Sequence, residues 1–340
     1  MSALAVHRAG PGVTVQDLGR PGYLRFGVSR GGAVDRLALS EGAALLGQSG
    51  DLAALELAGF GGDFEASEDI RIALTGAPMR ASIDGEAVAW NASYALPRGA
   101  RLSIGAVTAG SYGYLHVGGG IDAPEVMGAR SAHLAAGLGA VIEAGQILPI
   151  GKDGKPGNVG FCLDPALRFD GGRVRVVPGP QTRFFAEAER SRFASETFRR
   201  DTRGNRMGVR LLPEGAPYVS EAGLSVLSEA VVPGDIQVTG DGTPFVLMCE
   251  CQTTGGYPRI GSVLPSDLPR VAQAPVGATL RFEFVTHADA ARIEAAERKR
   301  IGGLRGTLRR LIRDPAEIRD LLSYQLIGGV TAGDDLDAAD

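Results

Sequence analysis

The segment at residues 252–257 brings together groups that could bind a small anion. It holds an amide, two hydroxyl groups, paired glycines and an aromatic ring, from Gln252, Thr253, Thr254, Gly255, Gly256 and Tyr257. The glycines let a ligand approach the backbone amides closely, and the tyrosine offers a flat apolar wall with a polar tip. The alternative is a structural turn, because glycines in strand-rich chains usually serve turns and bulges.

Two arginines in the segment 205–211 could hold a carboxylate or a phosphate. Arg206 and Arg210 carry planar guanidinium groups, which bind such anions through forked hydrogen bonds. The alternative is again structural, since Arg206 precedes Met207 and Gly208 in what could be a turn that packs the fold. Both arginines join the segment 252–257 as candidate substrate-binding residues.

Other chemical signatures do not occur in the sequence. It contains no Gly-x-x-x-x-Gly-Lys-Ser/Thr phosphate loop, no Gly-x-Ser-x-Gly nucleophile turn and no Cys/His catalytic signature. The histidines form no close pair and none lies near Cys249 or Cys251 in sequence, so we expect no metal site. The sequence therefore identifies no catalytic acid or base and no cofactor-binding residue.

Composition narrows the class of partner. The 340 residues are 44% hydrophobic and carry a formal net charge of −4, so nucleic-acid binding is not expected. No apolar run reaches the roughly 18 residues that span a bilayer, so no membrane association is expected. Three cysteines without a secretory leader favour reduced thiols and a cytoplasmic location.

The elements that must position these residues are mainly short strands between turn signals. Strands are predicted at residues 70–74, 112–117 and 174–177, and Asp84-Gly85 predicts a hairpin turn. A helix is predicted over residues 35–46, ended by Gly47.

Polar stretches near the middle of the chain divide it into two β-rich halves. The polar stretches 151–158 and 164–172 are predicted to link a domain at residues 1–155 to a second at 172–286. After Thr286, Ala, Glu, Arg and spaced Leu residues predict a helical extension over 287–330.

A set of ordered motifs resembles one family. Residues 14–22 read Thr-Val-Gln-Asp-Leu-Gly-Arg-Pro-Gly, residues 32–35 read Gly-Ala-Val-Asp, and residues 205–211 read Asn-Arg-Met-Gly-Val-Arg-Leu. Residues 252–258 read Gln-Thr-Thr-Gly-Gly-Tyr-Pro, and residues 267–273 read Asp-Leu-Pro-Arg-Val-Ala-Gln. In this order they resemble the family that unites the C subunit of 5-oxoprolinase with biotin-dependent carboxyltransferases. The same family includes allophanate hydrolase subunit 2 and an antagonist of a kinase inhibitor.

The resemblance implies two cyclophilin-like β-barrel domains in tandem with a C-terminal helical extension. It also implies that the chain is the C subunit of a complex. Its partners would be an A subunit and a B subunit, the latter related to allophanate hydrolase subunit 1. Such a complex hydrolyses 5-oxo-L-proline to L-glutamate with ATP, which is a cofactor of the complex as a whole.

Two alternatives stay open. One is a biotin-dependent carboxyltransferase acting on urea or a related small amide. Its biotin would arrive on another protein, because the chain has no Met-Lys-Met attachment site. The other is a non-enzymatic regulator that binds a subunit-1-like partner.

Overall fold

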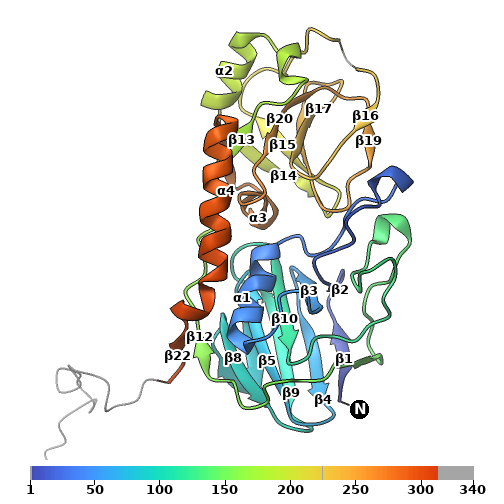
Figure 1. Cartoon of the computed structure of the whole chain (residues 1–340), viewed down its shortest axis with the longest axis vertical. Coiled ribbons are helices and arrows are strands. Elements are labelled where there is room, and N and C mark those ends of the chain that lie inside the picture. Colours follow the sequence, from blue (N-terminus) through green and yellow to red (C-terminus); the bar gives the residue numbers. More distant parts are fainter. Residues whose placement is uncertain (1, 224, 313–340) are drawn as a thin grey trace, which may run out of the picture.

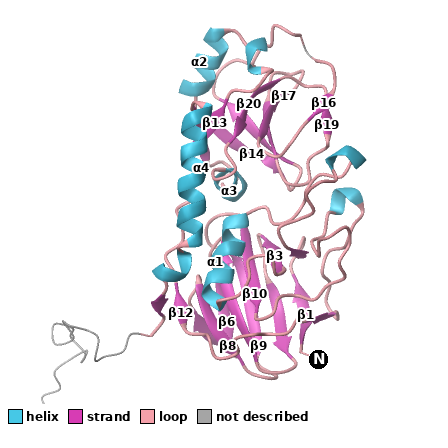
Figure 2. Cartoon of the chain, viewed as in Figure 1, coloured by secondary structure: helices cyan, strands magenta, loops and turns pink. Residues whose placement is uncertain are grey.

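Two β-rich halves are stacked along the long axis of the molecule, and helix α4 (His287–Gly302) runs beside both of them (Figure 1). This computed structural model describes residues 2–223 and 225–312. The strands fall into two separate groups, with helix α3 (Leu268–Gln273) between them (Figure 2). Within the described residues, no helix is both long enough and apolar enough to cross a bilayer.

The first half consists of two sheets, whose strands follow in spatial order. One sheet contains β11 (Ile147–Pro149), β1 (Ala3–Ala9), β4 (Gly62–Ala66), β9 (Arg101–Val107), β6 (Met79–Ile83) and β7 (Glu86–Val88). The other contains β2 (Thr14–Gln16), β3 (Ala54–Ala58), β10 (Tyr112–Val117), β5 (Ile70–Gly76), β8 (Ala92–Leu96), β12 (Phe161–Cys162) and β22 (Arg309–Arg310). The predicted hairpin is confirmed, because β6 and β7 pair across Asp84 and Gly85, both with positive φ.

The second sheet is buried on both faces because a helix covers its outer side. Side chains alternate along a strand, so Ile72 and Leu74 of β5 enter the core between the sheets. On the other face, Ala73 packs against Leu45 of α1 (Arg36–Leu46), and Thr75 Oγ1 donates to the Ala38 carbonyl at 2.9 Å. The predicted helix is confirmed, with Asp35 as its N-cap and Gly47 as its C-cap.

The second half closes into a barrel. Its strands follow the order β13 (Gly172–Val177), β20 (Arg259–Val263), β17 (Asp235–Val238), β18 (Pro244–Leu247), β15 (Gly208–Pro213), β14 (Phe198–Gly204) and β21 (Thr279–Phe284). Helix α2 (Glu187–Ser195) inserts Phe193 among Phe198, Tyr218 and Phe282, with ring centroids 4.9–5.6 Å from its own. The mainly β class and the C-terminal helix are thus confirmed.

The chain returns to the first half after α4. The helix ends at Gly302, sooner than the leucine spacing indicates, and a 3-10 turn (Leu304–Thr307) and β22 follow. Two successive glycines favour this end, and Leu304 then buries itself against Leu37 and Ala44 of α1. Residues 313–330 of the predicted extension lie outside the described residues.

The contact between α1 and β10 yields a testable prediction. A Cβ added at Gly42 would lie 2.3 Å from the ring of His116, which is itself buried and bonded to Thr75. Gly42→Ala should therefore destabilise the protein by about 1–3 kcal/mol through overpacking, although alanine is the better helix former. Urea unfolding followed by circular dichroism would measure the change.

Gly302→Ala is the matched control, because nothing lies within 4 Å of its added Cβ in α4. It should leave the free energy of unfolding unchanged or slightly raised. Equal stability of the two variants would contradict the close packing of α1 on β10.

Candidate functional site

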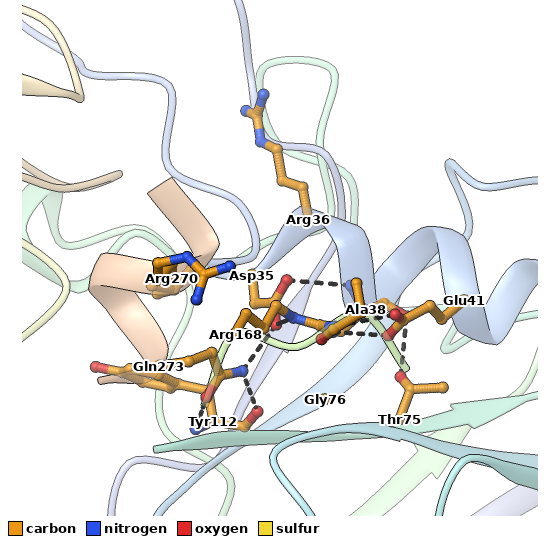
Figure 3. Close-up of polar contacts among 12 residues, drawn as sticks. Asp35, Arg36, Ala38, Glu41, Thr75, Gly76, Tyr112, Arg168, Arg270 and Gln273 are labelled. Carbon is orange, nitrogen blue, oxygen red and sulfur yellow. Dashed lines mark hydrogen bonds and ion pairs between the residues drawn. The ribbon is translucent and has the colours of Figure 1, made fainter. Parts of the chain in front are cut away.

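A buried carboxylate at the start of α1 joins the two halves of the molecule. Asp35 Oδ2 accepts hydrogen bonds from Arg168 Nε at 2.7 Å and from Gln273 Nε2 of α3 at 2.8 Å (Figure 3). Gln273 Oε1 in turn accepts from the backbone amides of Ser111 and Tyr112 in the first half, at 3.0 and 2.9 Å. The side chain of Gln273 therefore connects the second half both to the start of α1 and to strand β10 of the first half.

Arg168 makes the connecting segment part of this core. Its guanidinium group is only 3% exposed and binds both oxygens of Glu41, at 3.0 and 2.7 Å. The other predicted connecting stretch, residues 151–158, packs against the first half, because Asp153 accepts two hydrogen bonds from the buried Arg71 of β5. The polar composition of both stretches therefore reflects ion pairing with the folded halves as well as exposure to solvent.

Arg206 forms a second bridge between the halves. Its Nε donates to Glu250 at 2.6 Å, Nη1 donates to Glu56, and Nη2 donates to the Gly32 carbonyl at 2.7 Å. Burial by itself would lower the pKa of Arg206, but the two carboxylates raise it. All three guanidinium nitrogens of this predicted ligand-binding residue are therefore occupied within the chain.

Arg210 lies on β15, away from that bridge. Its Nη1 donates to Asp201 at 2.7 Å, and its Nη2 lies 3.4 Å from the Thr243 hydroxyl. The hydrogen bond from Arg210 holds the pKa of Asp201 well below its usual value. The structure thus places the two predicted arginines in separate ion pairs.

The predicted segment 252–257 forms the rim of a groove on the second half. Thr254 and Gly255 make up strand β19 (Thr254–Gly255), which pairs with β16 (Glu229–Ala230). The carbonyls of Thr253 and Gly256 accept from Val231 and Val226, so these four residues are held by backbone bonds. The side chains of Gln252 and Tyr257 line a groove of about 410 Å³.

The groove is also lined by the turn between β14 and β15 and by strand β17. Asn205, Met207 and Gln237 line it together with Gln252 and Tyr257. Gln252 Nε2 donates to Gln237 Oε1 at 2.9 Å, whereas the buried Nε2 of Gln237 has no hydrogen-bond partner. A Cβ at position 255 would lie 2.3 Å from that Nε2, so Gly255 is required for the close approach of the strand. Gln237, which lies in β17, was not predicted as a site residue.

Comparison of this chain with known proteins identifies its family. The model of the carboxyltransferase domain, subdomain A and B, matches residues 26–284. The C subunit of 5-oxoprolinase from Escherichia coli strain K12 is 36% identical over 283 residues, covering 82% of this chain and 90% of that protein. The chain belongs to this carboxyltransferase-domain family.

Further relatives extend the family match. The 5-oxoprolinase C subunit of Haemophilus influenzae is 32% identical, with the same coverage, and urea amidolyase of Saccharomyces cerevisiae is 28% identical over 337 residues. The crystal structure of Kluyveromyces lactis urea amidolyase matches 89% of this chain with a TM-score of 0.81 and 25% identity. The protein TTHA0988 matches 83% with a TM-score of 0.76 and 31% identity. This chain spans 20% of the former and 56% of the latter.

In this carboxyltransferase-domain chain, the ordered motifs meet at the junction of the halves. Asp35 ends the Gly-Ala-Val-Asp string, Gln273 ends the string at 267–273, and Arg206 contacts the Gly32 carbonyl. Glu56, which completes the Arg206 bridge, lies in a strand without any motif. No local pattern could have identified Glu56, because its partner is 150 residues away.

A serine, a histidine and a carboxylate also meet at the junction of this family member, but they do not form a nucleophilic triad. Ser29 Oγ lies 2.9 Å from His133 Nε2, and His133 Nδ1 lies 3.9 Å from Glu250. His133 Nδ1 accepts the Ala136 amide, so the neutral ring carries its proton on Nε2 and donates to the serine. Burial keeps the ring neutral by lowering the pKa of His133. Among the described residues, no group of three His, Cys, Asp or Glu could hold a metal ion.

The Arg206 bridge predicts a large loss of stability. Arg206→Ala leaves the buried carboxylates of Glu56 and Glu250 without their cation, so we expect a loss of about 3–5 kcal/mol in the free energy of unfolding. Urea titration monitored by circular dichroism would measure it.

Arg199→Ala is the control, because Arg199 and Glu214 face each other on the surface, 65% and 58% exposed. It should cost no more than about 1 kcal/mol. A similar loss in the two variants would show that the Arg206 bridge does not hold the halves together.

Proposed function

We propose that this chain is the C subunit of an ATP-dependent 5-oxoprolinase, which hydrolyses 5-oxo-L-proline to L-glutamate together with its A and B subunits. The observation that carries the proposal is the match to two proteins named as C subunits of 5-oxoprolinase, each covering 90% of the relative and 82% of this chain. By contrast, the chain corresponds to only 18% of the yeast urea amidolyase.

The partners and the nucleotide follow from this assignment. A protein named as a C subunit works with other subunits, which supports a heteromeric complex for this chain as well. The sequence lacks a phosphate loop, so we assign ATP to the complex as a whole. We place the complex in the cytoplasm, in keeping with the reduced state predicted for the three cysteines.

The groove beside Gln252 and Tyr257 is the proposed place of substrate contact. Its amide groups, on Gln252, Gln237 and Asn205, can donate to and accept from the amide of a lactam. Direct binding of the substrate by Arg206 or Arg210 remains a prediction. An anionic substrate would have to displace Glu250 from Arg206, or Asp201 from Arg210.

A second candidate is a carboxyltransferase that takes carboxybiotin from another protein and acts on urea or a related small amide. The description of the family model and the fold match to urea amidolyase favour it. The experiment must also distinguish these two candidates from a third, a regulatory role without catalysis.

The test is reconstitution of the complex. The chain is purified with its A and B subunits, and glutamate formation from 5-oxo-L-proline is measured with and without ATP. We expect ATP-dependent glutamate formation. Its absence from the intact complex would overturn the proposal, urea- and biotin-dependent ATP turnover would establish the second candidate, and tight binding without either activity would favour the regulator.

The same assay examines the groove. Tyr257→Ala should lower kcat/KM by about tenfold or more, a loss of roughly 1.4 kcal/mol of transition-state stabilisation. Tyr257 is 43% exposed, so its removal should not unfold the barrel. Phe60→Ala, which removes a 53% exposed aromatic ring from the first half, is the matched control and should be fully active. Equal activity of both variants would exclude Tyr257 from the site.

A further inference from the structure

The rim of the groove is carried by a ribbon that stands apart from the barrel. Strands β16 and β19 form a two-stranded sheet of their own, at the side of the second half that lies away from α4 (Figure 1). Among the described residues, neither strand pairs with a strand of the barrel. Side chains must therefore hold the ribbon in place. Val231, just after β16, supplies an apolar anchor by burying itself against Leu247 and Cys251.

The polar anchor of the ribbon is a single guanidinium group. Arg259, the first residue of β20, donates from Nη2 to the carboxylate of Glu229 at 2.7 Å. Its Nη1 donates to the carbonyl of Ala230 at 2.9 Å and to the carboxylate of Asp235, in β17, at 3.0 Å. Since Glu229 and Ala230 make up the whole of β16, Arg259 joins this strand to two strands of the barrel.

A buried amide completes the cluster around Arg259. Gln181 is 4% exposed, and its Oε1 accepts from the backbone amide and from Nε of Arg259, at 3.0 and 3.3 Å. Its Nε2 donates to Glu229 at 2.8 Å, which holds this half-exposed carboxylate in place. All three guanidinium nitrogens of Arg259 thus have fixed acceptors. Its side chain is only 16% exposed, so water screens these charge-assisted bonds less than it screens surface pairs.

The ribbon and the Arg259 cluster together set the geometry of the groove. Arg259 lies opposite Gln237 in the ladder between β17 and β20, and it follows shortly after Tyr257 in the chain. Gln237 and Tyr257 both line the groove, whereas Arg259 does not. The ribbon passes very close to Gln237, because a Cβ added at Gly255 would lie 2.3 Å from its amide nitrogen. A shift of the ribbon would therefore change the spacing between Tyr257 and Gln237.

We propose that Arg259 is a positioning residue of the groove. It does not touch the substrate, but it holds the ribbon so that Gln252 and Tyr257 face Gln237 at the spacing that the substrate requires. Because the groove is the proposed place of substrate contact, this inference rests on the proposed function. Arginine suits the role, since its planar fork reaches several acceptors at once, whereas lysine offers one charged nitrogen.

Kinetics of the reconstituted complex test this role. Arg259→Gln should raise the KM for 5-oxo-L-proline about tenfold and change kcat by less than about threefold, because it weakens binding without removing a group that contacts the reacting atoms. Arg259→Lys should give an intermediate KM, since its single nitrogen restores only part of the cluster. If Arg259→Gln does not fold, Glu229→Gln takes its place, and its KM should rise about threefold or more.

Hydrogen exchange in the isolated chain gives a second measurement that needs no catalysis. In Arg259→Gln, the amides of residues 226–231 and 253–256 should exchange faster than in the wild type, because the ribbon opens more often. The amides of β13 and β21, on another part of the barrel, should exchange at the wild-type rate.

Arg192→Gln is the matched control. Arg192 of α2 also binds two carboxylates, those of Glu189 and Glu196, and two backbone carbonyls, but it lies on the other side of the second half (Figure 1). Its KM and its ribbon exchange should match the wild type.

Three results would overturn the inference alone, in a wild-type complex that forms glutamate. They are a wild-type KM in Arg259→Gln, an equal rise of KM in Arg192→Gln, and wild-type exchange of the ribbon in Arg259→Gln. A wild-type complex that forms no glutamate would instead overturn the proposed function, and this inference with it.

Discussion

The carboxylate of Asp35 is the point on which the arrangement of the two halves depends. It caps α1 by accepting the Ala38 amide, and it also accepts hydrogen bonds from Arg168 and Gln273. These partners belong to a helix of the first half, the connecting segment and α3 of the second half. Since the carboxylate is fully buried, each of these bonds is strengthened by its low-dielectric surroundings, and the loss of any one leaves an unsatisfied group.

The same junction explains why the positive charges of this chain play different roles. Arg168 and Arg206 lie between carboxylates, so they fix the orientation of the halves, and every nitrogen of their guanidinium groups already bonds within the chain. Arg30 and Arg36, by contrast, line an apolar cavity and donate hydrogen bonds to the Leu18 carbonyl.

Much of the local structure was predictable from short-range patterns. The helix after Asp35, its end at Gly47 and the hairpin at Asp84 depend on capping and turn geometry, which a few neighbouring residues determine. The end of α4 was harder to predict, because the spaced leucines continue past Gly302. The two glycines at 302 and 303 and the burial of Leu304 against α1, which lies far away in sequence, favour the end of the helix there.

The sequence by itself determined the family and the mainly β class, because ordered motifs and turn residues are local properties. The role of the segment 252–257 in binding stays a prediction. Only the tertiary structure decided what the charged groups do. Arg206 looks like a free anion binder in sequence, and its partner Glu56 has no local signature. Conversely, only folding brings Arg36 to the Leu18 carbonyl beside an apolar cavity. Pairing of charges is a long-range property, since residues distant in sequence must meet before their electrostatic energies are set.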